Sequence, residues 1–297
     1  MTITPLAAVP PAHRTAAPVF RGRLGRDARS GHYAVPHRYR LHLSTACPDG
    51  LRLAVGHSLL GLDDSCPVTF LPALPDGHDD GGHAELRPLY EASAHHYRGP
   101  ALAPVLSDDW SGRIVSTHAA DILRDLDRFP RTGRGPLFPP GLESVLEAVE
   151  RMCAEGIEEA AQRAGHAGAG PAERAAALDV LLDTLGRLER RLTGEDHLAG
   201  DRLTAADIEL WVSLVRLDTV HRCHLDASAV QRIAGHRALW ACARRLTAHP
   251  AFGRHLDLDG IARRQRGRCR GLEAAGAAVQ ILDWEAYAAD APDASRR

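Results

Sequence analysis

A cysteine–proline pair, Cys47-Pro48, stands where a strand pattern gives way to a helix pattern, and this junction limits the folds open to the chain. Residues 38–43 alternate in the manner of a strand. From Pro48 apolar residues recur along an expected helix up to Gly61, and proline in the first turn with glycine after the last is the usual helix punctuation. A thiol at such a turn faces unpaired amides and the positive end of the helix dipole, and both favour the reactive thiolate.

The segments that follow predict the rest of a thioredoxin-like domain. Further strands are expected over 68–71, from 103–106 and over 113–115, with a turn at 108–112 and a helix from near Ser116. Residues 75–100 contain many Gly, Asp and His and predict mainly a connecting loop. The acid pairs at 63–64 and 108–109 are expected to be solvated turns. The order strand, helix, strand, loop, strand, strand, helix is the thioredoxin-like pattern.

Everything beyond a Pro/Gly-rich linker at 130–140 has the pattern of helices. Leucines at three- and four-residue spacing between 178 and 192 form one apolar stripe. Thr204 and Asp207 have the spacing of a capping box at the start of a helix, flanked by Leu203 and Ile208 as a hydrophobic staple. We therefore expect an N-terminal arm (1–36), an α/β thioredoxin-like domain (37–131), a linker (132–141), an all-α domain (142–270) and a C-terminal tail (271–297).

Composition excludes several classes of function. A length of 297 residues suggests two domains, and a net charge of −2 gives no basic surface for nucleic acid. All 36 basic residues are arginine, which excludes a lysine nucleophile or Schiff base. The N-terminus lacks the features of a signal peptide, no apolar run is long enough to span a membrane, and the six cysteines include no CxxC pair. We expect a cytoplasmic protein with reduced thiols and no membrane partner.

Other catalytic and metal patterns are weak or missing. His221, Cys223 and His224 are potential metal ligands within four residues, but neighbouring positions on a helix point in different directions, so no metal is predicted. No G-x-S-x-G elbow and no glycine-rich phosphate loop after a strand occur. The pattern around Cys47 itself leaves two interpretations open: a reactive thiol, or a small buried apolar side chain.

Several stretches resemble one known family. They are RYRLHLSTACP at 38–48, LLGL at 59–62, HYRG at 96–99, APVL at 103–106, GRIVS at 112–116, LTAADI at 203–208 and VRLD at 215–218. In this order, over roughly 37–266, the chain resembles the glutathionyl-hydroquinone reductases, the Xi class of glutathione transferases, which is related to the omega class. The resemblance implies that the all-α domain is a C-terminal helical bundle of the glutathione-transferase type.

The family resemblance also implies a mechanism. Cys47 would be the nucleophile that attacks the sulfur of a glutathionylated hydroquinone, and a second glutathione would resolve the mixed disulfide. Pro104 would be a cis-proline, with the backbone of Ala103 binding the cysteinyl part of the thiol. Pro48, Thr117 and His118 would complete the thiol site, and the enzyme would be a homodimer.

The chain departs from the family at its polar anchors. The family's Cys-Pro-Trp-Ala is Cys47-Pro48-Asp49-Gly50 here, and a carboxylate beside the thiol should oppose its ionisation. The Glu-Ser pair that holds the γ-glutamyl group corresponds to His118-Ala119, and an arginine before the cis-proline strand corresponds to Pro100. The tyrosines that contact the hydroquinone oxygen correspond to Glu158, His221 and Gln265, which with Asp49 would form the substrate pocket.

Three hypotheses follow from the match and its departures. The first is a thiol-dependent reductase or transferase that uses glutathione or, in a GC-rich actinobacterium, mycothiol, which has no γ-glutamyl group. The second is a tailoring enzyme of secondary metabolism that acts on an aromatic metabolite with His118, His221 or Glu158 as acid–base groups. The third is a non-catalytic binding or assembly protein.

Overall fold

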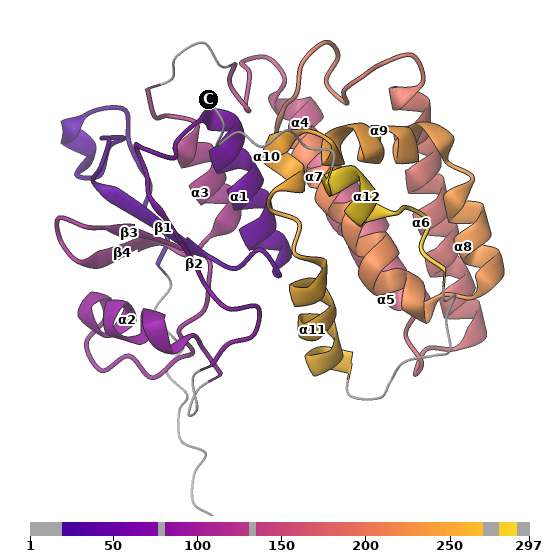
Figure 1. The fold of residues 1–297 in the computed structure, drawn as a ribbon, viewed down its shortest axis with the longest axis horizontal. Helices are drawn as coiled ribbons and strands as arrows, with labels where there is room; N and C mark the ends of the chain where they lie inside the picture. Colours follow the sequence, from indigo (N-terminus) through magenta and orange to yellow (C-terminus); the bar gives the residue numbers. More distant parts are fainter. Residues whose placement is uncertain (1–19, 77–80, 131–134, 270–278, 290–297) are drawn as a thin grey trace, which may run out of the picture.

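The computed structural model describes residues 20–76, 81–130, 135–269 and 279–289. A four-stranded sheet with its helices forms the N-terminal half, and a helical half packs beside it (Figure 1). The strand order is β2-β1-β3-β4, where β1 (Tyr39–Leu43) pairs parallel with β2 (Val68–Phe70) and antiparallel with β3 (Val105–Asp108). β4 (Arg113–Ser116) pairs antiparallel with β3. The α/β thioredoxin-like pattern predicted from the sequence is confirmed.

The predicted junction at Cys47 forms as expected. Tyr39, Leu41 and Leu43 of β1 are fully buried, in the predicted alternation. Helix α1 (Pro48–Leu60) begins at Pro48 with Cys47 as its N-cap, and it ends at Gly61, whose φ of 67° is left-handed. α1 and α3 (Ala119–Leu126) pack against each other on the side of the sheet that faces the helical half (Figure 1).

A helix occupies part of the segment where a loop was predicted. A short 3₁₀ turn, η2 (Ala84–Leu86), leads into α2 (Arg87–Ser93), which covers the other face of the sheet (Figure 1). Leu86 and Tyr90 lie one turn apart and are buried there, and the Tyr90 hydroxyl donates to the Leu102 carbonyl at 2.7 Å. The loop prediction for 75–100 was wrong here because a seven-residue helix offers only one such apolar pair among many Gly, Asp and His.

Asp108 is not the solvated turn that the sequence suggested. It is the last residue of β3 and is 2% exposed, and it accepts hydrogen bonds from Arg38 at 3.1 and 2.9 Å. The Arg38 guanidinium lies 4.7 Å from the Trp110 ring centre and 5.1 Å from that of Tyr39. Since β1 and β3 pair Tyr39 with Asp108, the residue before Tyr39 reaches the carboxylate. The neighbouring Asp109 is exposed, as expected of a turn, and so are the acids at 63–64.

The described part of the N-terminal arm lies along the outer edge of β4. The Gly22 amide donates to the Val115 carbonyl at 2.8 Å, and the Thr117 amide donates to Phe20 at 2.9 Å. A short turn, η1 (Ala28–Ser30), follows. Ion pairs join this segment to α3: Arg21 pairs with Asp121 at 2.7 Å, and Arg23 pairs with Asp121 at 3.1 Å and with Asp125 at 2.8 Å.

The helical half is built around one buried helix, α7 (Ala205–Arg216). The elements before it are α4 (Glu143–Arg151), η3 (Met152–Glu159), α5 (Ala160–Ala164) and α6 (Pro171–Leu192). After it come η4 (Leu217–His221), η5 (Arg222–His224), α8 (Ala227–Ala234), α9 (Arg237–Thr247), α10 (Pro250–Gly253), α11 (Leu258–Cys269) and α12 (Trp284–Ala289). Both η3 and η4 are π-helical.

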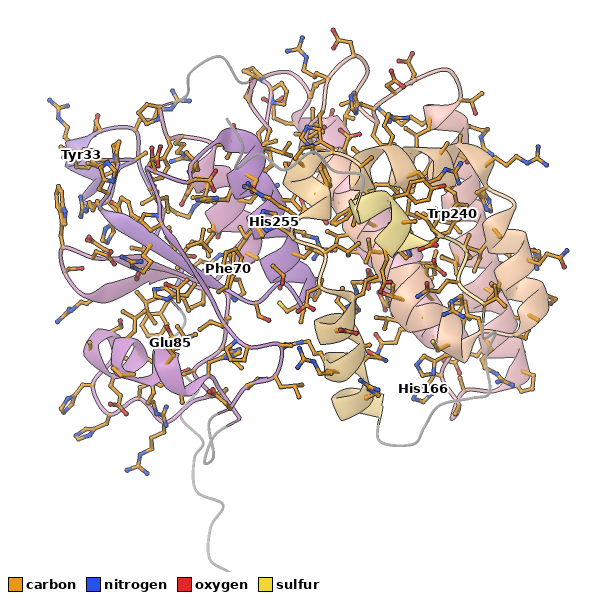
Figure 2. All side chains as sticks on the ribbon, in the orientation of Figure 1. Tyr33, Phe70, Glu85, His166, Trp240 and His255 are labelled. Carbon is orange, nitrogen blue, oxygen red and sulfur yellow. The ribbon has the colours of Figure 1, made fainter. Side chains whose placement is uncertain are left out.

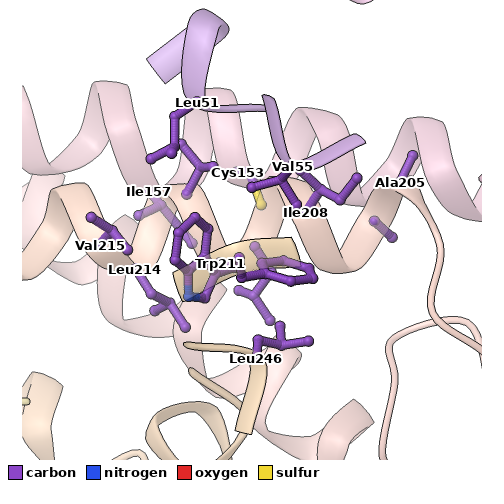
Figure 3. Close-up of a cluster of buried hydrophobic side chains, with 14 of the residues drawn as sticks. Leu51, Val55, Cys153, Ile157, Ala205, Ile208, Trp211, Leu214, Val215 and Leu246 are labelled. Carbon is purple, nitrogen blue, oxygen red and sulfur yellow. The ribbon is translucent and has the colours of Figure 1, made fainter. Parts of the chain in front are cut away.

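One apolar core continues through both halves. Leu51 and Val55 of α1 lie against Ile208 and Trp211 of α7 (Figure 3), and all four are 1% exposed or less. The predicted capping box begins α7, since the Asp207 carboxylate accepts the Thr204 amide at 2.8 Å. α1 therefore belongs to the packing of both domains.

Part of the segment expected as a C-terminal tail is folded. Trp284, the first residue of α12, is fully buried and lies near Trp240, with ring centres 6.4 Å apart. The buried carboxylate of Asp218 in η4 accepts hydrogen bonds from the Ile281 and Leu282 amides and from the Trp284 indole, at 2.9 to 3.0 Å. A fully buried carboxylate needs such donors, so these residues are fixed to the helical half.

Candidate functional site

The sheet topology brings the predicted site residues to one edge. β1 and β4 run in the same direction and β3 runs against them. The ends of β1 and β4 and the start of β3 therefore meet at the same edge of the sheet. Cys47 follows β1, Thr117 and His118 follow β4, and Pro104 immediately precedes β3.

The Cys47 sulfur lies at the N-terminus of α1. Its Sγ accepts a hydrogen bond from the Gly50 amide at 3.4 Å, and the side chain is 7% exposed. A Cβ at position 50 would come within 2.1 Å of the Ser44 carbonyl oxygen, so only glycine fits this turn. An amide that donates to sulfur at the positive end of a helix stabilises a thiolate.

Other cysteines lack this setting. Burial raises the pKa of Cys66 and of Cys242 to about 12, and it raises the pKa of Cys153 as well. Protonated thiols inside an apolar core are poor nucleophiles. Among the described cysteine side chains, Cys47 combines a helix N-terminus with an amide donor to its sulfur, whereas the half-buried Cys223 lies in the 3₁₀ turn η5.

The loop before β3 has the geometry expected beside a thiol. The Ala103–Pro104 bond is cis, as predicted. Neither the amide nor the carbonyl of Ala103 has a hydrogen-bond partner among the described residues. Leu102 next to it is exposed. This loop can offer one donor and one acceptor to an extended ligand.

The turn between β4 and α3 uses its polar groups within the protein. The Thr117 hydroxyl donates to the Phe20 carbonyl at 3.3 Å, the same oxygen that its amide bonds. The His118 Nδ1 accepts the Asp121 amide at 3.3 Å as the N-cap of α3, and the ring is 45% exposed. Both residues lie at the expected edge, but the hydroxyl hydrogen of Thr117 and the Nδ1 of His118 already form hydrogen bonds within the protein.

Asp49 does not face the thiol as a lone charge. Its carboxylate is 51% exposed and pairs with Arg52 one turn later at 3.0 Å. Arg52 also donates to Glu209 of α7 at 2.6 Å, so one guanidinium joins both carboxylates across the two halves. Burial raises the pKa of Glu209, and the Arg52 charge opposes that shift.

Glu158 and His221 meet in the helical half, as the family correspondence suggested. The Glu158 Oε2 accepts His221 Nε2 at 3.1 Å and Arg216 Nε at 2.7 Å. Burial alone would raise the pKa of Glu158, but hydrogen bonds and charge from His221 and Arg216 lower it, so the carboxylate is ionised at neutral pH. Gln265 lies half-buried on α11, and its place in a substrate pocket stays a prediction.

Both members of this pair stand in π-helical segments. Glu158 is in η3 and His221 is in η4. π-Helical turns are rare and occur frequently at functional sites. Gly156 allows η3 to pack closely on α6, because a Cβ there would lie 2.4 Å from the Thr184 hydroxyl. The irregular winding sets the direction of Glu158 and His221.

A groove of about 810 Å³ lies between β2 and the turn from α10 to α11, and Thr45, two residues before Cys47, also lines it. Phe70 and His255 line it from opposite sides of the domain boundary (Figure 2), with ring centres 6.0 Å apart. Burial lowers the pKa of His255 to about 4, so its ring is neutral. Ala54 and His57 of α1 face this groove, whereas Arg52 of the same helix contacts Glu209 of α7.

No metal site forms among the residues that the structure places: no group of three His, Cys, Asp or Glu side chains there could hold an ion. His221 is committed to Glu158, and Cys223 and His224 follow it in a 3₁₀ turn. Over the same described ranges, no helix is both long and apolar enough to cross a bilayer.

Comparison with known proteins agrees with this architecture. Residues 171–257 match the family model for the glutathione S-transferase C-terminal domain. Glutathionyl-hydroquinone reductase PcpF of Sphingobium chlorophenolicum is 31% identical over 257 residues, which cover 80% of each chain. The chain belongs to the glutathionyl-hydroquinone reductase family of glutathione transferases. The named relatives in this family are enzymes. This glutathione transferase is therefore an enzyme rather than a non-catalytic binding protein.

Solved structures place this glutathione transferase in the same fold. A glutathione-bound structure of YqjG, a glutathione transferase homologue from Escherichia coli K-12, is 26% identical with a TM-score of 0.74, and the match covers 89% of this chain and 94% of that one. A Xi-class glutathione transferase from Natrialba magadii is 26% identical with a TM-score of 0.73, covering 89% and 87%. The expected helical bundle of the glutathione-transferase type is confirmed.

Sequence reasoning missed three charged residues of this transferase's site, Arg52, Glu209 and Arg216. Arg52 follows Asp49 by three residues, a spacing that by itself allows an ion pair on a helix. Glu209 lies between apolar residues of α7, and an acid in such a stretch needs a cation or hydrogen-bond donors. No local pattern pairs Arg216 with Glu158, because they are 58 residues apart.

Proposed function

We propose that this protein is a Cys47-dependent reductase that removes a low-molecular-weight thiol from a conjugate with an aromatic hydroquinone. The observation that carries the proposal is the Cys47 sulfur at the N-terminus of α1, hydrogen-bonded by the Gly50 amide and placed at the same sheet edge as the cis-Pro104 loop. The names of relatives in the family support the substrate class.

The proposed reaction has two exchanges at sulfur. The Cys47 thiolate attacks the conjugate's sulfur, so an S–S bond forms while the bond from sulfur to the ring carbon breaks. The electron pair of that bond stays with the ring carbon, which takes up a proton and gives free hydroquinone. A second thiol, as its thiolate, then attacks the thiol-derived sulfur of the mixed disulfide, releasing Cys47 as thiolate and the small disulfide.

Glutathione is the first thiol to test, because a homologous structure is described as glutathione-bound. The turn from β4 to α3 argues for testing mycothiol beside it. Thr117 and His118 bond to Phe20 and Asp121, so the groups expected to hold a γ-glutamyl moiety are engaged within the protein. The homodimer and the cytoplasmic location remain part of this proposal.

The test is turnover of a glutathionyl-hydroquinone with added thiol, with hydroquinone and disulfide products measured by chromatography. Cys47→Ala should lower kcat/KM at least about 100-fold, because it removes the sulfur that forms the mixed disulfide at this sheet edge. Cys223→Ala, at a half-buried cysteine outside the site, should retain activity. Intact mass should show one thiol adduct on the wild type and none on Cys47→Ala. Full activity of Cys47→Ala would refute the proposal.

A second candidate function rests on the Glu158–His221 pair. A histidine hydrogen-bonded to an ionised carboxylate can act as a general base in a tailoring step that needs no thiol. Turnover of aromatic substrates that persists without thiol and in Cys47→Ala, but is lost in His221→Gln, would favour this function over the reductase.

A further inference from the structure

The first turn of α1 places a negative charge close to the sulfur that must ionise. Asp49 is the second residue of the helix and Cys47 is its N-cap. A like charge within one turn disfavours the thiolate, whereas the helix terminus and the Gly50 amide favour it. The outcome depends on whether something neutralises Asp49.

Arg52 is fixed in position to do so. Its side chain is 17% exposed, and it contacts Asp49 at 3.0 Å on one side and Glu209 at 2.6 Å on the other. The charged groups that act on Arg52 are Asp49 on its own helix, Glu209 on α7 and Glu158 on η3. His118 is the titratable side chain that the turn from β4 to α3 brings to the same edge.

The bond to Glu209 holds Arg52 in its place. An arginine with a single exposed partner samples many rotamers, and such an ion pair contributes little to the stability of the fold. Here the guanidinium is clamped between two helices of different domains, because the Glu209 carboxylate of α7 is only 18% exposed and a largely desolvated acid needs a cation. Because the bond to Glu209 already fixes the Arg52 side chain, the contact with Asp49 costs little additional conformational entropy.

We propose that Arg52 is a positioning residue for the Cys47 thiolate: anchored by Glu209 of the helical half, it binds Asp49 and shields the sulfur from that carboxylate. The inference deepens the proposed function, on which its importance for turnover rests. It also makes reactivity of a thiol in one domain depend on a carboxylate in the other. Asp49 replaces the family's tryptophan without inactivating the thiol because Arg52 accompanies it.

The test is the pH dependence of iodoacetamide labelling at Cys47, read by peptide mass spectrometry on the full chain. Arg52→Gln should shift the profile to higher pH by about half a unit to one unit and slow labelling at neutral pH about threefold to tenfold. Asp49→Asn alone should change the profile little, because its charge is already neutralised. The double variant should label within about twofold of Asp49→Asn, which a merely structural role of Arg52 does not predict.

Controls separate this effect from damage to the fold. Arg187→Gln removes a cation from a similar ion pair, with Asp183 on α6 at 2.7 Å, and should leave the Cys47 profile unchanged. Arg52→Lys should recover part of the shift. If Arg52→Gln unfolds because Glu209 loses its partner, Arg52→Gln with Glu209→Gln removes the unpaired acid and should show the same shift.

Two results would overturn the inference: an unchanged profile in a folded Arg52→Gln or Arg52→Gln/Glu209→Gln protein, or a double variant with Asp49→Asn that labels as slowly as Arg52→Gln alone. Labelling requires no substrate, so it is independent of the proposed reductase activity. A wild type that shows the Arg52 effect but no thiol-dependent turnover would refute the proposed function and leave this inference standing.

Discussion

Asp108 and Arg38 form the most enclosed ion pair of the sheet half among the described residues. Their side chains are 2% and 10% exposed, and they make two hydrogen bonds. Burial would raise the pKa of Asp108, but hydrogen bonds from Arg38 and the Trp110 amide hold it below its usual value. The pair therefore stabilises the fold fully above the unfolded carboxyl's pKa of about 4, and loses that effect as pH falls through the lower folded pKa.

Asp108→Asn should lower the free energy of unfolding by about 3 kcal/mol at pH 7, since it leaves Arg38 without its buried counter-charge. The difference from wild type should shrink as the pH is lowered below about 4. Asp109→Asn is the matched control, because its pair with Arg40 is over one-third exposed and should be worth less than about 1 kcal/mol. Urea titrations at several pH values measure both. A constant difference down to pH 2 would contradict this account.

Single residues were predictable where their role is set by their neighbours in sequence. The Cys47 N-cap and the cis bond at Pro104 follow from local motifs and the family match. The charge balance at Cys47 did not, because the partner that fixes Arg52 is 157 residues away. Distance in sequence, rather than chemistry, concealed that contact.

At the scale of elements, the capping box that begins α7 also holds the loop that precedes the helix. Asp207 is fully buried and accepts the Thr204 amide at 2.8 Å, the Thr204 hydroxyl at 3.2 Å and the Leu198 amide at 2.9 Å. Asp207 therefore serves more partners than Thr204 does, and the two residues should not be equal in their effect on stability.

Thr204→Ala should lower the free energy of unfolding by about 1 kcal/mol. Asp207→Ala should cost about 3 kcal/mol, because it leaves several buried donors unpaired. The double variant should lose less than the sum, since both residues share one hydrogen-bonded unit. Denaturant melts of the three variants provide the cycle. If the two single variants lost equal free energy of unfolding, or if their losses were strictly additive in the double variant, Thr204 and Asp207 would act as independent caps.

Element type was predictable where an apolar repeat is long, as in α6 and α7. The sequence prediction was wrong for α2, which is short. The sequence also contained no signal for the π-helical turns in η3 and η4. A π turn has no distinct residue preference and arises where packing forces an extra residue into a helix, such as the close contact of Gly156 with Thr184.

For the whole molecule, the larger apolar core is shared by both domains, and a smaller cluster that includes Leu86 and Tyr90 lies within the sheet half. Leu51 and Val55 on α1 are buried against α7, and the Arg52–Glu209 pair crosses the same boundary. A domain with its own core can fold alone, but residues 20–130 without α7 would expose this apolar face. Sequence patterns predict a boundary between the domains but could not show how completely the two domains pack together.

We expect the full chain to unfold in one calorimetric transition, with equal calorimetric and van't Hoff enthalpies, because the larger apolar core is built from residues of both halves. A fragment of residues 20–130 should be insoluble or lack cooperative melting. Differential scanning calorimetry of both proteins is the measurement. Two separated transitions, or a fragment that melts cooperatively, would show independent domains.

The strand-like segment at 20–24 protects the open edge of the sheet from edge-to-edge aggregation. β4 is an edge strand, and Phe20 and Gly22 occupy hydrogen-bonding groups at its end while Arg21 and Arg23 neutralise two carboxylates of α3. An uncovered edge is a template for adding another chain. Proteolysis or genetic trimming within this segment would therefore open the sheet to edge-to-edge aggregation, although Cys47 and the cis-Pro104 loop would still be present.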